Sequence, residues 1–474
     1  MMLAMAKTGA AAIASGLLGA LGTKIVAALL GPGSIALLAT LQQLRDGAVT
    51  VATANGRSAL VQGASARDGI ERREYLRTVA LLFSGATLLV VTAMLTAPAS
   101  LVQWSRLPAA SEALLPWLAL TVGLLSAFVF LTAILNALRE IGKLALLQVG
   151  SPLAAALVAW PVATAVRAGH PTAIVWFLTI PAAATLAAAS IALRGHRLYE
   201  WFRGAGRWWS FPAARGFLSI SGALLLSGLA ATIALLAVRG TITRHQGLAM
   251  TGQFDAAWNI SMNQVTLLLG SVQAYYLPTL AAAESTPERG RQIHGMLMAA
   301  TLGAVPAIVA LAALKPVVVH LLYSSQFVSS AGFLRWTLLG DYLKVGSWVL
   351  ATPMLATRDV GAFLTTDLAT HAAFFGTSVL LARIVPPAEG AAIGFLASYA
   401  LYFALCCGYA YVRHGFRFGA AGLSAWLLGL GLIVGASASA WADTTAHFAR
   451  ASFWIVLATG FSTGFALYFW RRER

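Results

Sequence analysis

The stretch from residue 8 to residue 30, TGAAAIASGLLGALGTKIVAALL, decides the fold class, because it is apolar or small throughout apart from Lys24. A helix needs about 20 mostly apolar residues to cross the hydrocarbon core of a bilayer. The run is longer than the apolar core of a signal peptide, and no convincing cleavage site precedes the next hydrophobic segment. We therefore expect an uncleaved first transmembrane span.

Similar runs continue along the whole chain. Of its 474 residues, 59% are hydrophobic and only 10% are charged, whereas a soluble domain carries about 25% charged residues. The runs fall at about 8–31, 34–62, 78–104, 112–136, 142–166, 171–193, 215–238, 248–277, 293–322, 329–356, 361–384, 389–412, 419–441 and 450–470. Helices satisfy their own backbone hydrogen bonds in lipid. The sequence thus predicts an all-α polytopic membrane protein with about 14 transmembrane helices.

The distribution of positive charge predicts the topology. The chain has 32 Lys and Arg against 16 Asp and Glu, a formal net charge of +16. With the N-terminus in the cytoplasm, 20 of the 32 basic residues fall in cytoplasmic segments and six in spans. The six in periplasmic loops are Arg106, Arg167, Arg239, Arg244, Arg383 and Arg450. By the positive-inside rule, both termini are predicted to be cytoplasmic, in the inner membrane of a bacterium, and nucleic acid is not expected as a partner.

The longest loop, about residues 194–214, suggests the domain organisation. It mixes arginines with Trp201, Trp208 and Trp209, which suits either a helix in the headgroup region or a linker whose tryptophans anchor neighbouring helices. The predicted parts are an N-terminal lobe at 1–200, an interfacial linker at 201–214, a C-terminal lobe at 215–413 and an additional helix pair at 414–474. Six spans per lobe would permit a parallel repeat.

Ionised residues inside predicted spans are the candidate functional groups. They are Lys24, Arg45, Asp46, Arg57, Asp255, Lys315, Arg335, Asp341, Lys344 and Asp367, with His371 as a further titratable group. A charge at the bilayer centre costs about 2.5–3.5 kcal/mol, so most should face each other or a water-filled cavity. We expect Lys315 and Arg335, close to span ends, to extend toward the membrane surface.

The first two spans hold a candidate anion site. Lys24, Arg45 and Arg57 are three cations with a single nearby anion, Asp46. Arg45 and Asp46 are adjacent, so we expect that they do not share a helix face. Arginine and lysine both bind phosphate oxygens, which predicts a diphosphate site.

Four groups are candidates for ion coupling: Asp46, Asp255, Asp367 and His371. Asp367 and His371 are four residues apart, as Asp341 and Lys344 are three apart, so each pair can meet on one helix face. Histidine titrates near neutral pH, although a plain interhelical hydrogen bond explains Asp367 and His371 equally well. No Walker-type phosphate loop, nucleophile–base pair or metal-ligand spacing is present, so we expect neither an enzyme nor a cofactor.

Several segments in a fixed order resemble a known family. They are Lys24 with Gly31-Pro32-Gly33, Ala39-Thr40-Leu41-Gln42-Gln43-Leu44, Asn55-Gly56, the run from Trp258 to Leu280, Gly340-Asp341-Tyr342-Leu343-Lys344-Val345-Gly346, and Tyr402 to Gly408. Over about residues 7–413 the chain resembles the Wzx flippases, particularly those for lipid III of enterobacterial common antigen and for O-antigen, within the multidrug/oligosaccharidyl-lipid/polysaccharide exporter superfamily.

This resemblance implies two six-helix lobes, alternating access and a cationic central cavity. The implied substrate is an undecaprenyl-diphosphate-linked oligosaccharide, and the implied partners are membrane lipid, a polysaccharide polymerase and a chain-length regulator. Lys24, Asp341 and Lys344 match residues expected in the family, whereas Asn263 stands where an Asp is expected. The predicted substrate-binding residues of the cavity are therefore Lys24, Arg45, Arg57, Asp341 and Lys344. The last two spans go beyond the twelve-span form.

Three alternatives remain. A multidrug antiporter of the same superfamily should have an acidic cavity, whereas this chain has more bases than acids in its spans. A flippase for the peptidoglycan precursor lipid II would share the architecture. A membrane-embedded polysaccharide polymerase or ligase would need a sizeable periplasmic loop, and all the predicted ones are short.

Overall fold

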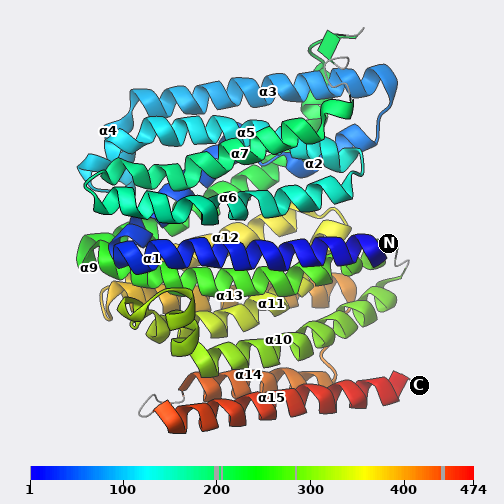
Figure 1. Ribbon diagram of the computed structural model, residues 1–474. Helices are drawn as coiled ribbons and strands as arrows, with labels where there is room; N and C mark the ends of the chain where they lie inside the picture. Colours follow the sequence, from blue (N-terminus) through cyan, green and yellow to red (C-terminus); the bar gives the residue numbers. More distant parts are fainter. Residues whose placement is uncertain (1, 197–201, 204–205, 283–284, 439–443, 474) are drawn as a thin grey trace. The chain divides into compact units, whose positions relative to one another are not determined.

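The computed structural model describes residues 2–196, 202–203, 206–282, 285–438 and 444–473, so Trp201 of the predicted linker lies outside the described residues. Every described element is a helix (Figure 1). The first eight long helices are α1 (Met2–Ala52), α2 (Arg57–Ser65), α3 (Gly69–Thr96), α4 (Pro98–Ser105), α5 (Leu115–Ala137), α6 (Ile141–Arg167), α7 (Trp176–Ala192) and α9 (Phe211–Ala282). The rest are α10 (Thr286–Leu322), α11 (Ser330–Ala356), α12 (Val360–Leu381), α13 (Pro387–His414), α14 (Ala420–Ala438) and α15 (Thr444–Glu473). Short 3₁₀ turns lie at Ala109–Leu114, Pro171–Val175, Arg194–His196 and Ser325–Phe327.

Each of the fourteen predicted spans lies largely within helix, which confirms the all-α class. Among the described residues, ten helical stretches are long and apolar enough to cross a membrane. Two of them, α1 and α9, each contain two predicted spans. Helices α11 and α12 are not among the ten, because Asp341 with Lys344, and Asp367 with His371, lower their hydropathy.

Helices α1 and α9 each bend at a glycine with positive φ. Gly31 has φ 74° and ψ −175°, and Gly247 has φ 82° and ψ 170°. Residues with a Cβ rarely adopt this conformation, whereas glycine does so readily. Pro32 follows Gly31 directly, and its fixed φ suits the first residue of the next helical segment. The glycines therefore let one span pass into the next without a loop.

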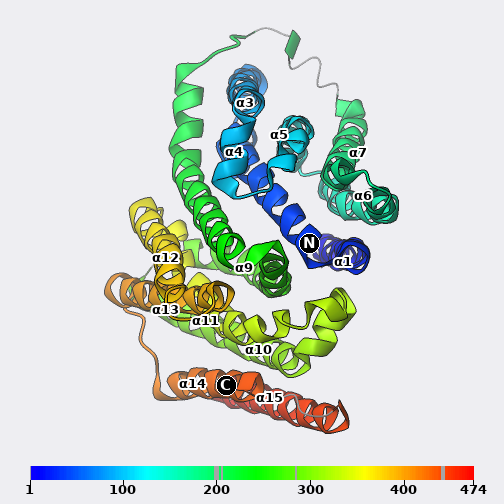
Figure 2. The same ribbon diagram turned by 90° about the vertical axis from the view of Figure 1, so that its left-hand side faces the viewer.

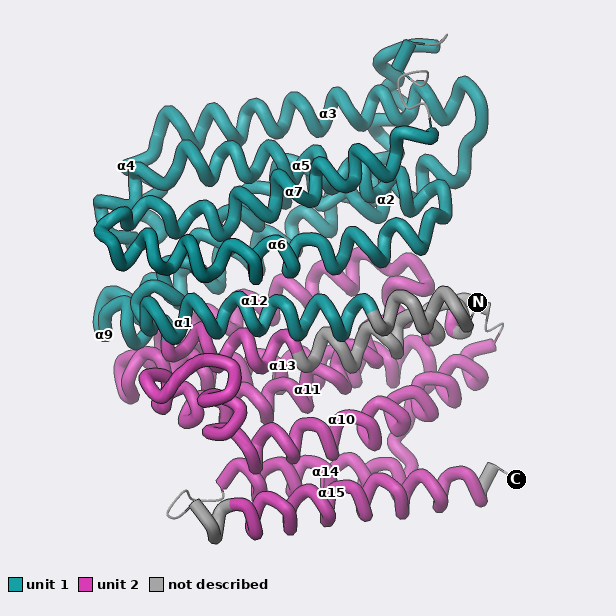
Figure 3. The backbone as a smooth tube through the Cα atoms, viewed as in Figure 1, with its two compact units in different colours: residues 1–252 teal, residues 253–474 magenta. Residues whose placement is uncertain are grey.

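The chain divides into two compact units, Met1–Gly252 and Gln253–Arg474 (Figure 3). In the first unit, α5 lies between α3 and α7, while α6 packs on α1 (Figure 2). Its core includes Tyr75, Phe83, Ile134 and Phe217. In the second unit, α13 packs on α11 and α12, and α10 packs on α11, α14 and α15. The predicted lobes divide the chain at 215 instead, so the first part of α9 lies in the first unit.

Small residues allow α1 and the turn that follows it to pack closely on α9, on both sides of its bend at Gly247, within the first unit. A Cβ on Gly252 would lie 1.9 Å from the carbonyl oxygen of Pro32, and one on Gly56 would lie 2.1 Å from the Phe217 ring. Helices in membranes use such small residues to bring their backbones together. The same contact between α1 and α9 brings Gln43 of α1 close to Thr232 and Arg239 of α9.

The described part of the predicted linker is tied to the start of α3. The guanidinium of Arg77 donates to the carbonyl of Gly206 at 2.7 Å, and the amide of Ser210 donates to the Thr78 hydroxyl at 3.0 Å. Trp208 and Trp209 remain about half exposed. Such exposed tryptophans suit both a headgroup segment and an anchoring linker, so both interpretations of the linker stay predictions.

Candidate functional site

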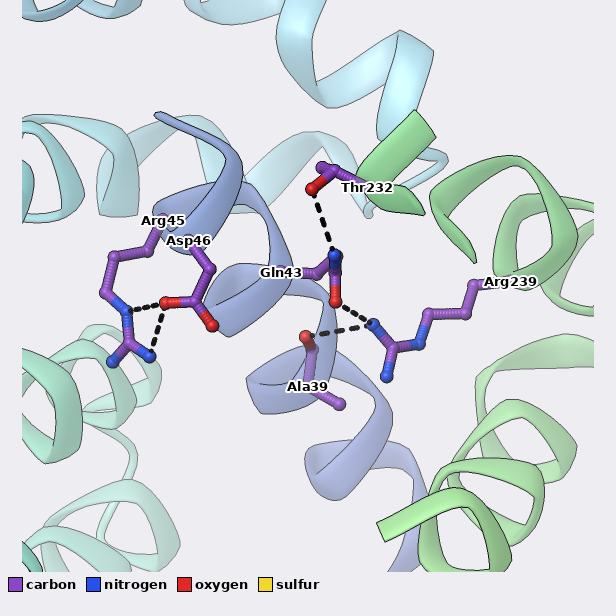
Figure 4. A network of polar contacts seen from close by, with 6 residues as sticks. All are labelled: Ala39, Gln43, Arg45, Asp46, Thr232 and Arg239. Atoms are coloured by element: carbon purple, nitrogen blue, oxygen red, sulfur yellow. Dashed lines mark hydrogen bonds and ion pairs between the residues drawn. The ribbon is translucent and has the colours of Figure 1, made fainter. Parts of the chain in front are cut away.

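A polar network joins α1 to the first part of α9 in the first unit (Figure 4). Arg239 Nη1 lies 3.4 Å from both the Ala39 carbonyl oxygen and Gln43 Oε1, and Gln43 Nε2 lies 3.4 Å from Thr232 Oγ1. Arg239 is only 4% exposed. The network thus places Arg239 of α9 beside the second predicted span, which itself contains Arg45 and Asp46.

The assignment of Arg239 to a periplasmic loop was wrong. Helix α9 continues from Phe211 through Gly247, so Arg239 is helical and buried against α1. It precedes Gly247 by eight residues, about 12 Å along the helix axis. Sequence reasoning missed this cation because the hydrophobic run ends at Val238, although the helix does not.

Arg45 and Asp46, which are adjacent and were not expected to share a helix face, nevertheless form an ion pair. Arg45 Nε donates to Asp46 Oδ1 at 2.9 Å, and Arg45 Nη2 lies 2.8 Å from the same oxygen (Figure 4). The long arginine side chain reaches around the helix, which adjacent Cα positions alone do not reveal. The side chain of Asp46 is 57% exposed, against 20% for Arg45. The pair is therefore locally neutral and open on its acidic side.

The second predicted span is broken just before Arg57. Helix α1 ends at Ala52, and Ala54 and Asn55 have φ values of 47° and 48°. Asn55 Nδ2 donates to the Leu224 carbonyl at 2.8 Å, which holds the break against α9. Asparagine tolerates the left-handed conformation better than most residues. Exposed Arg57 is consequently the first residue of α2, where backbone N–H groups have no partner in the preceding turn.

Lys24, Arg45 and Arg57 lie at three depths. Lys24, which is half-buried, precedes the bend at Gly31 by seven residues, and Arg45 follows it by fourteen. At 1.5 Å per residue these separations are about 10 Å and 21 Å along the two arms. Arg57 lies farther along, beyond the break. Lys24, Arg45 and Arg57 thus form a series of cations along α1 and the start of α2, and not one compact cluster.

In the second unit, Asp341 and Lys344 are both buried on α11. Lys344 Nζ lies 3.0 Å from Met262 Sδ and 5.5 Å from the ring centroids of Trp348 and Tyr399. Aromatic faces stabilise an ammonium group. Within the described residues no ion pair shorter than 4.0 Å joins Asp341 to Lys344, although the two charges interact electrostatically.

Asp367 and His371 on α12 do meet as predicted, with 3.4 Å between Oδ2 and Nε2. Tyr399 of α13 is half-buried and interacts electrostatically with both Asp341 and Asp367. The structure thereby gathers groups from α11, α12 and α13 around one tyrosine. Sequence reasoning missed Tyr399, because no charge marks it and only the packing of α13 on its neighbours reveals its position.

The remaining candidates lie elsewhere. Asp255 is fully buried on α9 beyond Gly247 and interacts with Tyr323. Arg335 is half exposed and forms an ion pair with Glu389. Lys315 is only 5% exposed, and its Nζ donates to the Ser437 carbonyl at 2.6 Å. The expectation that Lys315 extends to the membrane surface was therefore wrong, because its side chain is buried and donates to a carbonyl of α14 instead.

The sequence of this chain is similar to known proteins over part of its length. No protein-family model matches the chain. It is 24% identical over 187 residues to the lipid III flippase of Escherichia coli (strain K12) and to that of Shigella flexneri. These alignments cover 39% of this chain, and the chain spans only 44% of the length of each relative.

Solved structures match over much more of the chain. The lipid II flippase MurJ, in an inward closed conformation, matches with a TM-score of 0.75 over 100% of both chains at 13% identity. A multidrug resistance MATE family transporter of the MOP superfamily, inward-facing, matches with a TM-score of 0.68 at 15% identity, over 84% of this chain and 94% of its own. The chain therefore has the fold that these two kinds of membrane transporter share, which agrees with the predicted architecture.

Proposed function

We propose that this protein is a flippase that carries an undecaprenyl-diphosphate-linked oligosaccharide from the cytoplasmic to the periplasmic leaflet of a bacterial inner membrane. The observation that carries the proposal is the charge of the first two predicted spans, where Lys24, Arg45 and Arg57 accompany one acidic residue, Asp46. A translocated diphosphate is anionic, and guanidinium and ammonium groups bind phosphate oxygens. The partial likeness to lipid III flippases supports the same substrate class.

The three depths of these cations suggest how the headgroup travels. With both termini in the cytoplasm, Arg57 lies toward the cytoplasmic end of its span, and Lys24 lies closest to the bend at Gly31. The diphosphate would meet Arg57 first, then Arg45, then Lys24, as two lobes at about 1–200 and 215–413 alternate their access. Asp46 would keep Arg45 from binding the phosphate too tightly to release it.

The titratable groups of α11, α12 and α13 in the second unit are the proposed coupling site. Asp341 and Asp367 interact with Tyr399, and His371 lies 3.4 Å from Asp367. Intramembrane carboxylates and histidines commonly relay protons or bind transported ions. Together with Asp46 and Asp255, these groups would couple the substrate to an ion gradient. Glycan delivered to the periplasm would pass to a polysaccharide polymerase and a chain-length regulator, which are proposed partners.

The test is export of lipid-linked glycan by variants in a strain that lacks the gene. We expect Lys24→Ala and Arg57→Ala to reduce export at least about tenfold, the effect of losing one charge-assisted phosphate contact. Arg167→Ala, which removes an exposed arginine at the end of α6, is the matched control and should export normally. Near-normal export by both Lys24→Ala and Arg57→Ala at equal membrane abundance would refute the diphosphate path.

Two related functions are favoured by particular observations. The full-length match to MurJ favours lipid II as substrate, and rescue of a strain depleted of its lipid II flippase would establish that. Buried Asp255 and Asp341, with half-buried Asp367, in the second unit would suit an organic cation. Increased resistance to cationic drugs on expression, with unchanged lipid-linked glycan in the deletion strain, would establish a drug exporter instead.

A further inference from the structure

A groove of about 690 Å³ lies in the second unit, outside the residues considered above for translocation. The ends of α10, α11 and α14 form its walls. Its lining includes Lys315, Val328, Arg335, Trp336, Leu339 and Ser437. Most of the wall is apolar, and its charged groups come from α10 and α11.

Two polar side chains that line the groove are more than nine-tenths buried. Lys315 is 5% exposed and uses one bond, to the Ser437 carbonyl, whereas an ammonium group has three protons to donate. Ser437 is 6% exposed, and its hydroxyl has no hydrogen-bond partner among the described residues. Buried polar groups in native proteins are normally satisfied. Lys315 and Ser437 thus offer unused donors at one place in the wall.

The charge of the wall favours an anion. Arg335 is close enough to Lys315 for their positive charges to repel each other. The guanidinium of Arg335 forms an ion pair with Glu389 and lies 4.9 Å from the centroid of the Trp336 ring. Two positive charges and one negative charge leave a net charge of one positive at this wall. A ligand with a single negative charge would balance it.

The groove also lies at the right depth for a lipid phosphate. Lys315 precedes the end of α10 by seven residues, and Arg335 follows the start of α11 by five. These separations are about 10 Å and 8 Å along the helix axes, and Ser437 lies one residue before the end of α14. All three therefore lie within about 10 Å of a helix terminus and line the same groove, and near its termini a spanning helix passes from hydrocarbon to headgroup. The predicted topology makes this the periplasmic side.

We propose that this groove binds an anionic phospholipid of the periplasmic leaflet. Its phosphodiester accepts hydrogen bonds from Lys315 and the Ser437 hydroxyl, and Arg335 balances its charge from the rim. An acyl chain lies along the apolar wall formed by Val328 and Leu339. The single charge of a phosphodiester matches the wall better than the two charges of a polyprenyl diphosphate do. This lipid is a bound component of the second unit and is not the translocated substrate.

The experiment uses the purified full chain in detergent, with bound lipid counted by native mass spectrometry. Phosphatidylglycerol is added in one series and phosphatidylcholine, which is zwitterionic, in a second. We expect one phosphatidylglycerol to remain bound under conditions that remove phosphatidylcholine. Equal retention of the two lipids would overturn the proposal of an anionic ligand.

A variant that fills the groove localises the binding. A Cβ on Gly332, which lines the groove, would meet no atom within 4 Å, so Gly332→Phe should occupy the space without disturbing the fold. Gly376→Phe is the matched control, because Gly376 is an exposed helical glycine of α12 with equally open surroundings. We expect Gly332→Phe to lose the bound lipid and Gly376→Phe to keep it. Retention of the lipid by Gly332→Phe would place the binding elsewhere and overturn the proposal.

Two further measurements address the headgroup. Lys315→Met and Ser437→Ala should each weaken phosphatidylglycerol binding by about tenfold, as expected for loss of a charge-assisted or buried hydrogen bond. Ser437→Ala removes a hydroxyl that has no described partner, so it should leave thermal stability unchanged. Displacement of the lipid by inorganic phosphate alone, or by an equal amount of polyprenyl diphosphate, would overturn the assignment to a phospholipid. Glycan export is not the readout, so failure here leaves the flippase proposal intact.

Discussion

Helices α1 and α9 have the same construction and different chemistry. Each joins two predicted spans across a glycine with positive φ, Gly31 in α1 and Gly247 in α9. Beyond the bend, α1 carries Arg45 and Asp46 and then breaks before Arg57, whereas α9 carries Asp255 and continues to Ala282. The same kind of glycine bend thus accompanies basic residues in one half of the chain and a buried acid in the other.

The break explains part of this divergence. Directly after α1, Ala54 and Asn55 have positive φ, a conformation that asparagine tolerates better than most residues, and Asn55 donates to the Leu224 carbonyl. No Asn-Gly pair follows Gly247 in α9. The break therefore gives the chain a new helix start at Arg57, whereas α9 continues without one. The difference teaches that two helices with the same glycine bend can present different polar groups.

The largest expected effect tests the close contact between α1 and α9. Gly252→Ala places a Cβ 1.9 Å from the Pro32 carbonyl oxygen, a backbone atom that cannot move independently. We expect a loss of about 3 kcal/mol in unfolding free energy, the upper end of the usual range for overpacking. The measurement is denaturant unfolding of the purified protein in detergent.

Gly222→Ala, on the same helix α9, is the control for this substitution. Its Cβ would meet no atom within 4 Å, so it should gain up to about 1 kcal/mol from better helix propensity. Equal stability of the two variants would show that α1 and α9 are not packed as closely as described.

A smaller effect tests whether the two bends are equivalent. Gly31→Ala and Gly247→Ala each force a residue with a Cβ into backbone conformations near φ 80° and ψ 180°. We expect each to cost about 2 kcal/mol, within the range for such strain, measured by the same unfolding assay. Gly33→Ala, at a helical glycine with open surroundings, is the control. A neutral Gly247→Ala beside a destabilising Gly31→Ala would break the comparison between the helices.

The sequence predicted the fold much better than the site. Fourteen hydrophobic runs are a strong signal, because lipid requires helices of nearly fixed length. Contacts between residues four apart in one helix were also predictable, as the Asp367–His371 pair shows. Arg239 was misplaced because hydropathy ends where a charge appears, while the helix continues to the bend. Tyr399 and the burial of Lys315 depend on packing between distant helices, which no single segment encodes.

The smallest expected effect concerns the ion pair between Arg45 and Asp46. The Asp46 side chain is 57% exposed, and in the water-filled cavity proposed for the substrate such an exposed pair contributes about 0–1 kcal/mol. A double-mutant cycle of Arg45→Met and Asp46→Asn should therefore give a coupling energy below about 1 kcal/mol. A coupling above about 2 kcal/mol would mean that Arg45 is committed to Asp46 and is not available to a phosphate.

Export by Asp46→Asn separates the two roles proposed for this carboxylate. Slower release of the substrate with continued export would fit a carboxylate that weakens phosphate binding by Arg45. Complete loss of export in a stably folded variant would fit a ligand of the coupling ion, so that α1 as well as α9 would carry a functional carboxylate.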